Sequence, residues 1–187
     1  MAEQPSGRVR LVEMVVESVR VHMLSSQHVV ILKESERERY LPIWIGPCEA
    51  DAITVELQDV EVARPLTHDI LKNVITELGG KVVRVEISDL RNDIFYATLI
   101  IETKGKTVEI DSRSSDALAL AVRARVPIFV HDAVMSKAAI VPESEVEAEA
   151  GEAAAAEGSE RLSAFSDFVD SLDFEDLDKD KKDDDDE

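Results

Sequence analysis

Five charged residues in the middle of the chain form two short clusters whose residue types suit chemistry on phosphates. Glu49 and Asp51 follow the apolar run YLPIWI, and Asp111, Arg113 and Asp116 follow the run TVEI. Carboxylates gathered at such strand-to-helix junctions can bind Mg²⁺ or Mn²⁺, which activates water and neutralises phosphate charge. The clusters predict a metal site formed by Glu49, Asp51, Asp111 and Asp116. Asp51, Asp116 and Arg113 are the expected catalytic residues, with Arg113 steadying a phosphate.

The same carboxylates have a structural explanation. Glu49, Asp51 and Asp116 are expected in the first turns of helices, where negative charge complements the helix dipole. Under this alternative the two junctions are capped helix ends and nothing more.

The histidines are weaker candidates. His131 lies beside Asp132, which could orient its imidazole as a general base. His22, His28 and His68 are expected to be structural or exposed to solvent. The chain also lacks the motifs of phosphate-loop nucleotidases, dinucleotide oxidoreductases, zinc proteases and serine hydrolases.

Charge is distributed very unevenly along the chain. The net charge is −19, of which −15 falls in residues 143–187 and only −4 in residues 1–142. No basic stretch indicates tight, sequence-independent binding of nucleic acid, although an enzyme that reaches phosphates through a metal ion needs less positive charge. No apolar run approaches the roughly 18 residues of a membrane span, so we expect a cytoplasmic protein. Cys48, the single cysteine, excludes an internal disulfide and is expected to be a small buried hydrophobic residue.

Hydrophobic periodicity predicts one mixed domain of the α+β type over residues 9–142. Strands are expected at 11–23, 28–33, 40–45, 81–88, 93–102, 107–110 and 127–130, and helices from 47, from 67 to 78, at 114–124 and at 132–139. In the helix that follows Thr67, its expected N-cap, five apolar residues share one face: Ile70, Leu71, Val74, Ile75 and Leu78.

The order of elements repeats, as two similar β-β-β-α halves. With an offset of 65 residues, Asp51 falls on Asp116, and each is followed by Ala and then by Ile or Leu. If the halves pair about a pseudo-twofold axis, these two aspartates occupy equivalent positions.

Residues 143–187 are expected to be an acidic, mostly disordered tail, because their composition cannot bury enough apolar surface to fold. Within the tail, residues 160–173 carry an apolar stripe at helical spacing: Leu162, Phe165, Phe168, Val169 and Leu172. Such a stripe could form a short amphipathic helix that docks on a protein partner or on the domain itself.

Four blocks closely resemble the bacterial bifunctional nuclease domain family: LPIWIGPCEADAITVEL, RPLTHDILKNVITELGG, DIFYATLII and EIDSRSSDALALAVRARVPIFV. The resemblance covers about residues 12–141 and does not reach the tail. It implies a nuclease that hydrolyses both DNA and RNA, with nucleic acid as its substrate. It supplies no established catalytic set, so the candidate residues remain those of the two acidic clusters.

A second class of function stays open. A non-catalytic oligomeric scaffold or regulator, or a small-ligand-binding protein, would also fit a mildly acidic domain with a partner-docking tail. A homo-oligomer is expected in either case, because several strands leave at least one sheet edge open.

The composition change at residue 142 predicts that the tail is dispensable for folding. Truncation after Ser144 should leave the thermal midpoint, followed by circular dichroism, close to that of the full chain. A fall of more than about 8 °C, roughly 1.5–3 kcal/mol for a domain of this size, would contradict the prediction and indicate that the Phe165 and Phe168 stripe packs on the body.

Overall fold

The computed structural model describes residues 10–21 and 27–142. Seven strands are present: β1 (Leu11–Val21), β2 (His28–Glu34), β3 (Tyr40–Ile45), β4 (Gly80–Arg91), β5 (Ile94–Thr103), β6 (Lys106–Arg113) and β7 (Ile128–His131). Four helices accompany them: α1 (Pro47–Leu57), α2 (Thr67–Glu77), α3 (Ser114–Ala124) and α4 (Asp132–Ala138). The expected α+β class is confirmed.

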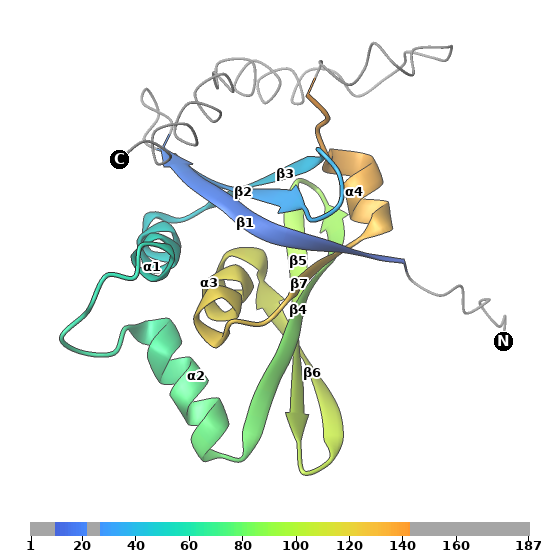
Figure 1. The fold of residues 1–187 in the computed structure, drawn as a ribbon. Helices are drawn as coiled ribbons and strands as arrows, with labels where there is room; N and C mark the ends of the chain where they lie inside the picture. The colour runs from blue at the N-terminus through green and yellow to red at the C-terminus, as the bar shows by residue number, and fades with distance from the viewer. Residues whose placement is uncertain (1–9, 22–26, 143–187) are drawn as a thin grey trace, which may run out of the picture. The chain divides into compact units, whose positions relative to one another are not determined.

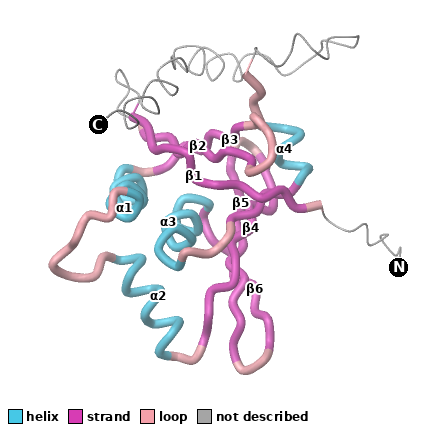
Figure 2. The backbone as a smooth tube through the Cα atoms, in the orientation of Figure 1, coloured by secondary structure: helices cyan, strands magenta, loops and turns pink. Residues whose placement is uncertain are grey.

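All seven strands form one mixed sheet in the order β3-β2-β1-β7-β4-β5-β6 (Figures 1 and 2). Strands β1 to β3 form one antiparallel meander, and strands β4 to β6 form the other. The short strand β7 joins them, antiparallel to β1 and parallel to β4. The strands β1 and β4 therefore run in opposite directions, as two halves related by a rough twofold axis through β7 require.

The two halves are confirmed as β-β-β-α units, but strand pairing sets an equivalence different from the offset of 65. His28 pairs with Ile45 in the first half, as Tyr96 pairs with Arg113 in the second, which is an offset of 68. The helix that follows begins at Pro47 in one half and at Ser114 in the other. The helix starts differ by 67 residues rather than 68, so it is by position in the helix that Glu49 is the counterpart of Asp116: each is the third residue of its helix.

The helix α3 lies at the centre of the core. Its residues from Ala117 to Ala121 are wholly buried. It packs against α1, α2 and strands of both meanders, β3 as well as β4 to β6. A helix that is apolar on nearly all sides must be surrounded in this way. The two halves thus share one core, with α3 inside it.

The helix α2 turns its polar side toward this core. Arg123 of α3 has a side chain only 2% exposed, and its Nε donates a hydrogen bond to Oδ1 of Asp69 at 2.8 Å. Lys72 donates a hydrogen bond to the backbone oxygen of Arg123. The expected apolar face of α2 exists, but most of it lies at the surface: Ile70, Leu71, Val74 and Leu78 are exposed.

Smaller details differ from the expectations. Cys48 is exposed, because it is the second residue of α1, which buries the side that begins with Glu49 and Ala50. The N-cap of α2 is Leu66 rather than Thr67, and its backbone N–H is bound by the Asp69 carboxylate at 2.7 Å.

Among the described residues, no helix is long and apolar enough to cross a membrane. The acidic tail, with its expected helix at 160–173, lies outside the described residues, as does His22.

The buried Arg123 makes the stability of the domain depend on Asp69. Replacing Asp69 by Ala leaves the guanidinium without its carboxylate and should lower the free energy of unfolding by about 3–5 kcal/mol, measured by urea denaturation. Asp51→Ala, which removes an exposed carboxylate from α1, is the matched control and should change it by less than about 1 kcal/mol.

A double variant tests the cause. In Asp69→Leu/Arg123→Met no charge remains to be neutralised, so much of the lost stability should return. A double variant as unstable as Asp69→Ala would show that the charge pair is not the reason.

Candidate functional site at three helix N-termini

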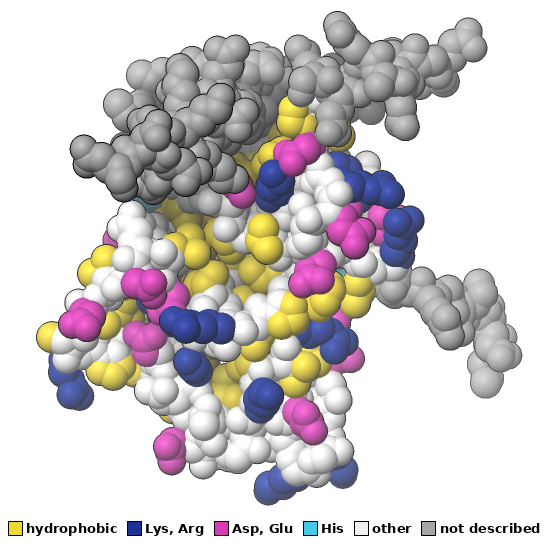
Figure 3. Space-filling view, viewed as in Figure 1, with side chains coloured by type: hydrophobic (Ala, Val, Ile, Leu, Met, Phe, Trp, Pro, Cys, Tyr) yellow, Lys and Arg dark blue, Asp and Glu magenta, His cyan; other side chains and the backbone are white. Residues whose placement is uncertain are grey.

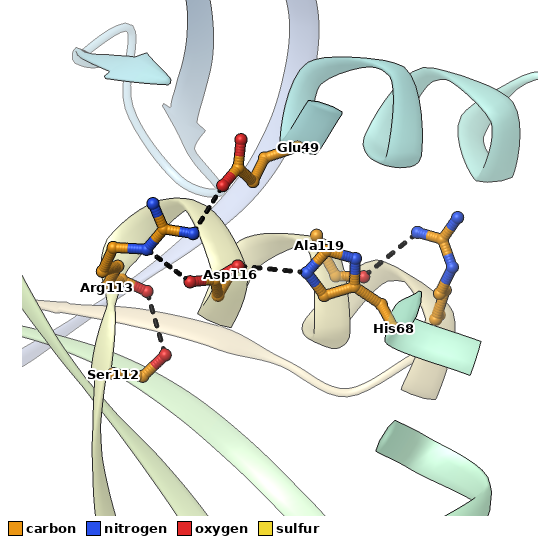
Figure 4. Close-up of polar contacts among 7 residues, drawn as sticks. Glu49, His68, Ser112, Arg113, Asp116 and Ala119 are labelled. Carbon is orange, nitrogen blue, oxygen red and sulfur yellow. Dashed lines mark hydrogen bonds and ion pairs between the residues drawn. The ribbon is translucent and has the colours of Figure 1, made fainter. Parts of the chain in front are cut away.

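The first turns of α1, α2 and α3 meet at one place. Glu49 is the third residue of α1, His68 the second residue of α2, and Asp116 the third residue of α3. Arg113, the last residue of β6, is the N-cap of α3. We call these four residues the Arg113 cluster (Figure 4).

Arg113 joins the two acidic residues of the cluster. Its Nη2 donates a hydrogen bond to Oε1 of Glu49 at 2.6 Å, and its Nε donates another to Oδ2 of Asp116 at 2.7 Å. The second carboxylate oxygen of Asp116 lies 3.3 Å from Nε2 of His68. A continuous polar chain therefore runs from α1 through Arg113 and α3 to α2 (Figure 4).

Burial differs sharply within the cluster. The Arg113 side chain is 71% exposed, whereas the side chains of Glu49 and His68 are only 12% and 10% exposed. The guanidinium is thus open to solvent, and its partners form the wall behind it. An exposed cation held by one buried and one partly buried carboxylate is oriented while it remains accessible to an anion.

Electrostatics keeps Asp116 ionised. Partial burial alone would raise the pKa of this carboxyl, but hydrogen bonds from Arg113 and His68, together with their charge, outweigh burial and hold the pKa below its ordinary value. The hydrogen bond to Asp116 and the two carboxylate charges raise the pKa of the Arg113 guanidinium. Arg113 and Asp116 are therefore both charged at neutral pH.

The structure brings together three of the five residues singled out in the sequence: Glu49, Arg113 and Asp116. Asp51 is exposed two residues further along α1, and Asp111 is exposed on β6, opposite Thr98. Within residues 10–21 and 27–142, no three His, Cys, Asp or Glu side chains are grouped in a way that could hold a metal ion. Arg113 occupies the position between the two carboxylates.

His68 joins the site although the sequence did not single it out. Its partner Asp116 is 48 residues away, so no local spacing could pair them. The available signal was its position in the first turn of an amphipathic helix. His131 makes a contact that the sequence did not suggest: its Nε2 lies 3.3 Å from Oε2 of Glu86, a residue of β4.

Charge on the surrounding surface is mixed. On the face drawn in Figure 3, basic and acidic side chains are interspersed and form no continuous basic stripe. Any anion bound here must therefore be held locally by the Arg113 cluster rather than by a broad positive field.

Fold and site together define an α+β domain in which two β-β-β-α halves enclose a polar cluster at their helix N-termini. The model of the bifunctional nuclease domain matches residues 30–143. The chain belongs to this family.

Comparison with individual proteins is consistent with this family. An uncharacterized protein of Mycobacterium tuberculosis is 42% identical over 144 residues, which cover 77% of this chain and 83% of the relative. Bifunctional nuclease 2 of Oryza sativa subsp. japonica is 30% identical over 55% of this chain and 33% of its own length. Bifunctional nuclease 1 of Arabidopsis thaliana is 26% identical over 55% and 33%. The chain thus spans about a third of the plant proteins it matches.

The low pKa of Asp116 predicts a pH-dependent contribution to stability. A carboxyl whose pKa is lowered in the folded state stabilises it above the unfolded value, about 3.9, and loses this contribution as the pH falls through the folded value. The difference in free energy of unfolding between the natural protein and Asp116→Asn should therefore be present at pH 5 and shrink below about pH 4.

Urea denaturation at a series of pH values from 3 to 7 measures this difference. The same series on Asp59→Asn, an exposed aspartate outside the cluster, gives the baseline. A difference for Asp116→Asn that stays constant down to pH 3 would contradict the assignment.

Proposed function

We propose that this protein is a nuclease whose reaction centre is the Arg113 cluster. The observation that carries the proposal is the exposed Arg113 guanidinium, held by two carboxylates where three helices begin. Helix N-termini present backbone N–H groups and the positive end of the helix dipole, and they favour bound phosphate. A guanidinium adds a planar pair of donors that fits two phosphate oxygens.

His68 is the proposed carrier of a proton. A carboxylate that accepts a hydrogen bond from one imidazole nitrogen fixes the ring and its tautomer, and Asp116 is placed to do this. The other nitrogen would take a proton from water or give one to the leaving oxygen. Because His68 is largely buried, the substrate must approach along the side that Arg113 occupies.

Glu49 has a positioning role in this scheme. Glu49 belongs to the other half of the domain, and its Oε1 accepts a hydrogen bond from Nη2 of Arg113. The guanidinium is therefore fixed from two sides, by α1 through Glu49 and by α3 through Asp116.

A divalent cation remains part of the proposal. Mg²⁺ is commonly bound by one or two carboxylates together with water and substrate phosphates, so an ion that enters with the substrate would need only a further oxygen of Glu49 or Asp116, with Arg113 still held between them. Such an ion would neutralise phosphate charge and lower the pKa of bound water.

The proposed substrates are both RNA and DNA. DNA lacks the 2′-hydroxyl, so a single site that cleaves both must use water, and not the neighbouring hydroxyl, as its nucleophile. The names of the plant relatives support a double specificity, and the mildly acidic body favours single strands that can bend to reach a local site.

A non-catalytic scaffold is the second candidate. The observation in its favour is the outward apolar face of α2, since a surface of this kind serves association rather than hydrolysis.

Cleavage of single-stranded RNA and DNA tests the proposal. With Mg²⁺ or Mn²⁺ present, His68→Gln, Asp116→Asn and Arg113→Lys should each lower the rate by about 10²–10⁴-fold, the contribution typical of a positioned acid or base. EDTA should abolish cleavage by the natural protein. Asp59→Asn, on the surface at the end of α1, should retain full activity.

Asp51→Asn and Asp111→Asn examine the two aspartates that lie outside the cluster. Loss of activity in these variants would place the reaction centre on the expected metal ligands instead of on His68 and Arg113. Cleavage that persists unchanged in a His68→Gln/Asp116→Asn double variant, purified free of host nucleases, would rule out the proposed centre and favour the scaffold.

A further inference from the structure

The helix α2 is amphipathic in the opposite sense to an ordinary surface helix. The side of α2 that faces the core carries His68 and Asp69, both bound to α3, and one apolar residue, Ile75. Three other apolar residues of the helix and its C-cap Leu78 are exposed. An amphipathic surface helix normally turns its apolar stripe to the core. We call the exposed residues Ile70, Leu71, Val74 and Leu78 the outer face of α2.

The side chains of the outer face are large, apolar and well exposed to solvent. Leu78 is 74% exposed, Ile70 53% and Val74 46%. Leu57, Val60 and Val62, just before α2 in the chain, are also exposed, and hydrophobic side chains are visible over the α1–α2 connection in Figure 3. Large apolar side chains that gather at the surface of one helix and of the loop before it indicate an interaction site on a folded protein.

We propose that the outer face of α2 pairs with the same face of a second copy of this chain. Leu71, Val74 and Leu78 follow the 3-4 spacing by which two helices interlock along a seam. A twofold interface uses the same patch on both subunits, and a single apolar stripe meets this requirement by itself.

Charge fixes the direction of the two helices. Arg64 is exposed just before α2, and Glu77 is exposed in its last turn. In an antiparallel pair, the end of one helix that carries Arg64 faces the end of the other that carries Glu77, and the helix dipoles also oppose each other favourably. A parallel pair would set like charges side by side.

The same charges disfavour the acidic tail as the occupant. The exposed charged residues from Asp59 to Lys81 are balanced: three acids, Asp59, Glu61 and Glu77, and three bases, Arg64, Lys72 and Lys81. A segment with a net charge of −15 meets no positive excess there, whereas a second copy of a balanced surface meets no net repulsion.

The mass of the full-length protein, from sedimentation or light scattering at tens of micromolar, tests the proposal. The natural protein should be a dimer or a multiple of it, and Val74→Glu should weaken association at least about 30-fold, as loss of a central interface residue does. Thr76→Glu, on the same helix but off the outer face, should leave the dissociation constant unchanged.

Exchanging the charges of Arg64 and Glu77 distinguishes this interface from any other contact between two copies. Arg64→Glu and Glu77→Arg should each weaken association, and the double variant should restore it. A monomeric natural protein would overturn the proposal. So would a dimer that persists in folded Val74→Glu but separates in Val108→Glu, because Val108 is exposed on the edge strand β6 and its loss would place the interface there.

Discussion

The ion pair between Arg123 and Asp69 constrains the rest of the structure. A guanidinium that is almost fully buried must keep a carboxylate partner, because the cost of desolvating an unpaired charge is several kcal/mol. Asp69 can meet this need only if α2 turns its polar side to α3. Two consequences follow from that orientation: His68, one residue earlier, comes within reach of Asp116, and the apolar stripe of α2 is left at the surface.

The Arg113 cluster depends equally on the joining of the two halves. Glu49 comes from the first β-β-β-α unit, whereas Arg113 and Asp116 come from the second. The two acids hold equivalent places in their helices, so the near-symmetry of the fold brings two like charges together. Arg113 has no counterpart in the first half, where Gly46 precedes α1, and this asymmetry lets one guanidinium neutralise both carboxylates.

The helix α2 connects the two proposals. It carries His68 on the side that faces the cluster and the outer face on the opposite side, so association and chemistry share one rigid element. Pairing of two copies through α2 would restrain the helix that positions His68. It would also place two Arg113 clusters in one particle, which suits a substrate with many phosphates.

The sequence by itself determined most elements, because periodicity and turn residues are local: the bounds of α3 were expected at 114–124 and are found there. It also determined the candidate residues Glu49, Arg113 and Asp116, since acids and arginine at helix starts are visible in the chain. Only the tertiary structure decided that Asp51 and Asp111 lie apart from them, because the packing of α1 against α3 determines which side of α1 faces Arg113. It alone decided the orientation of α2. An amphipathic pattern shows that one side of a helix is apolar, and a buried charge elsewhere in the fold decides which side packs.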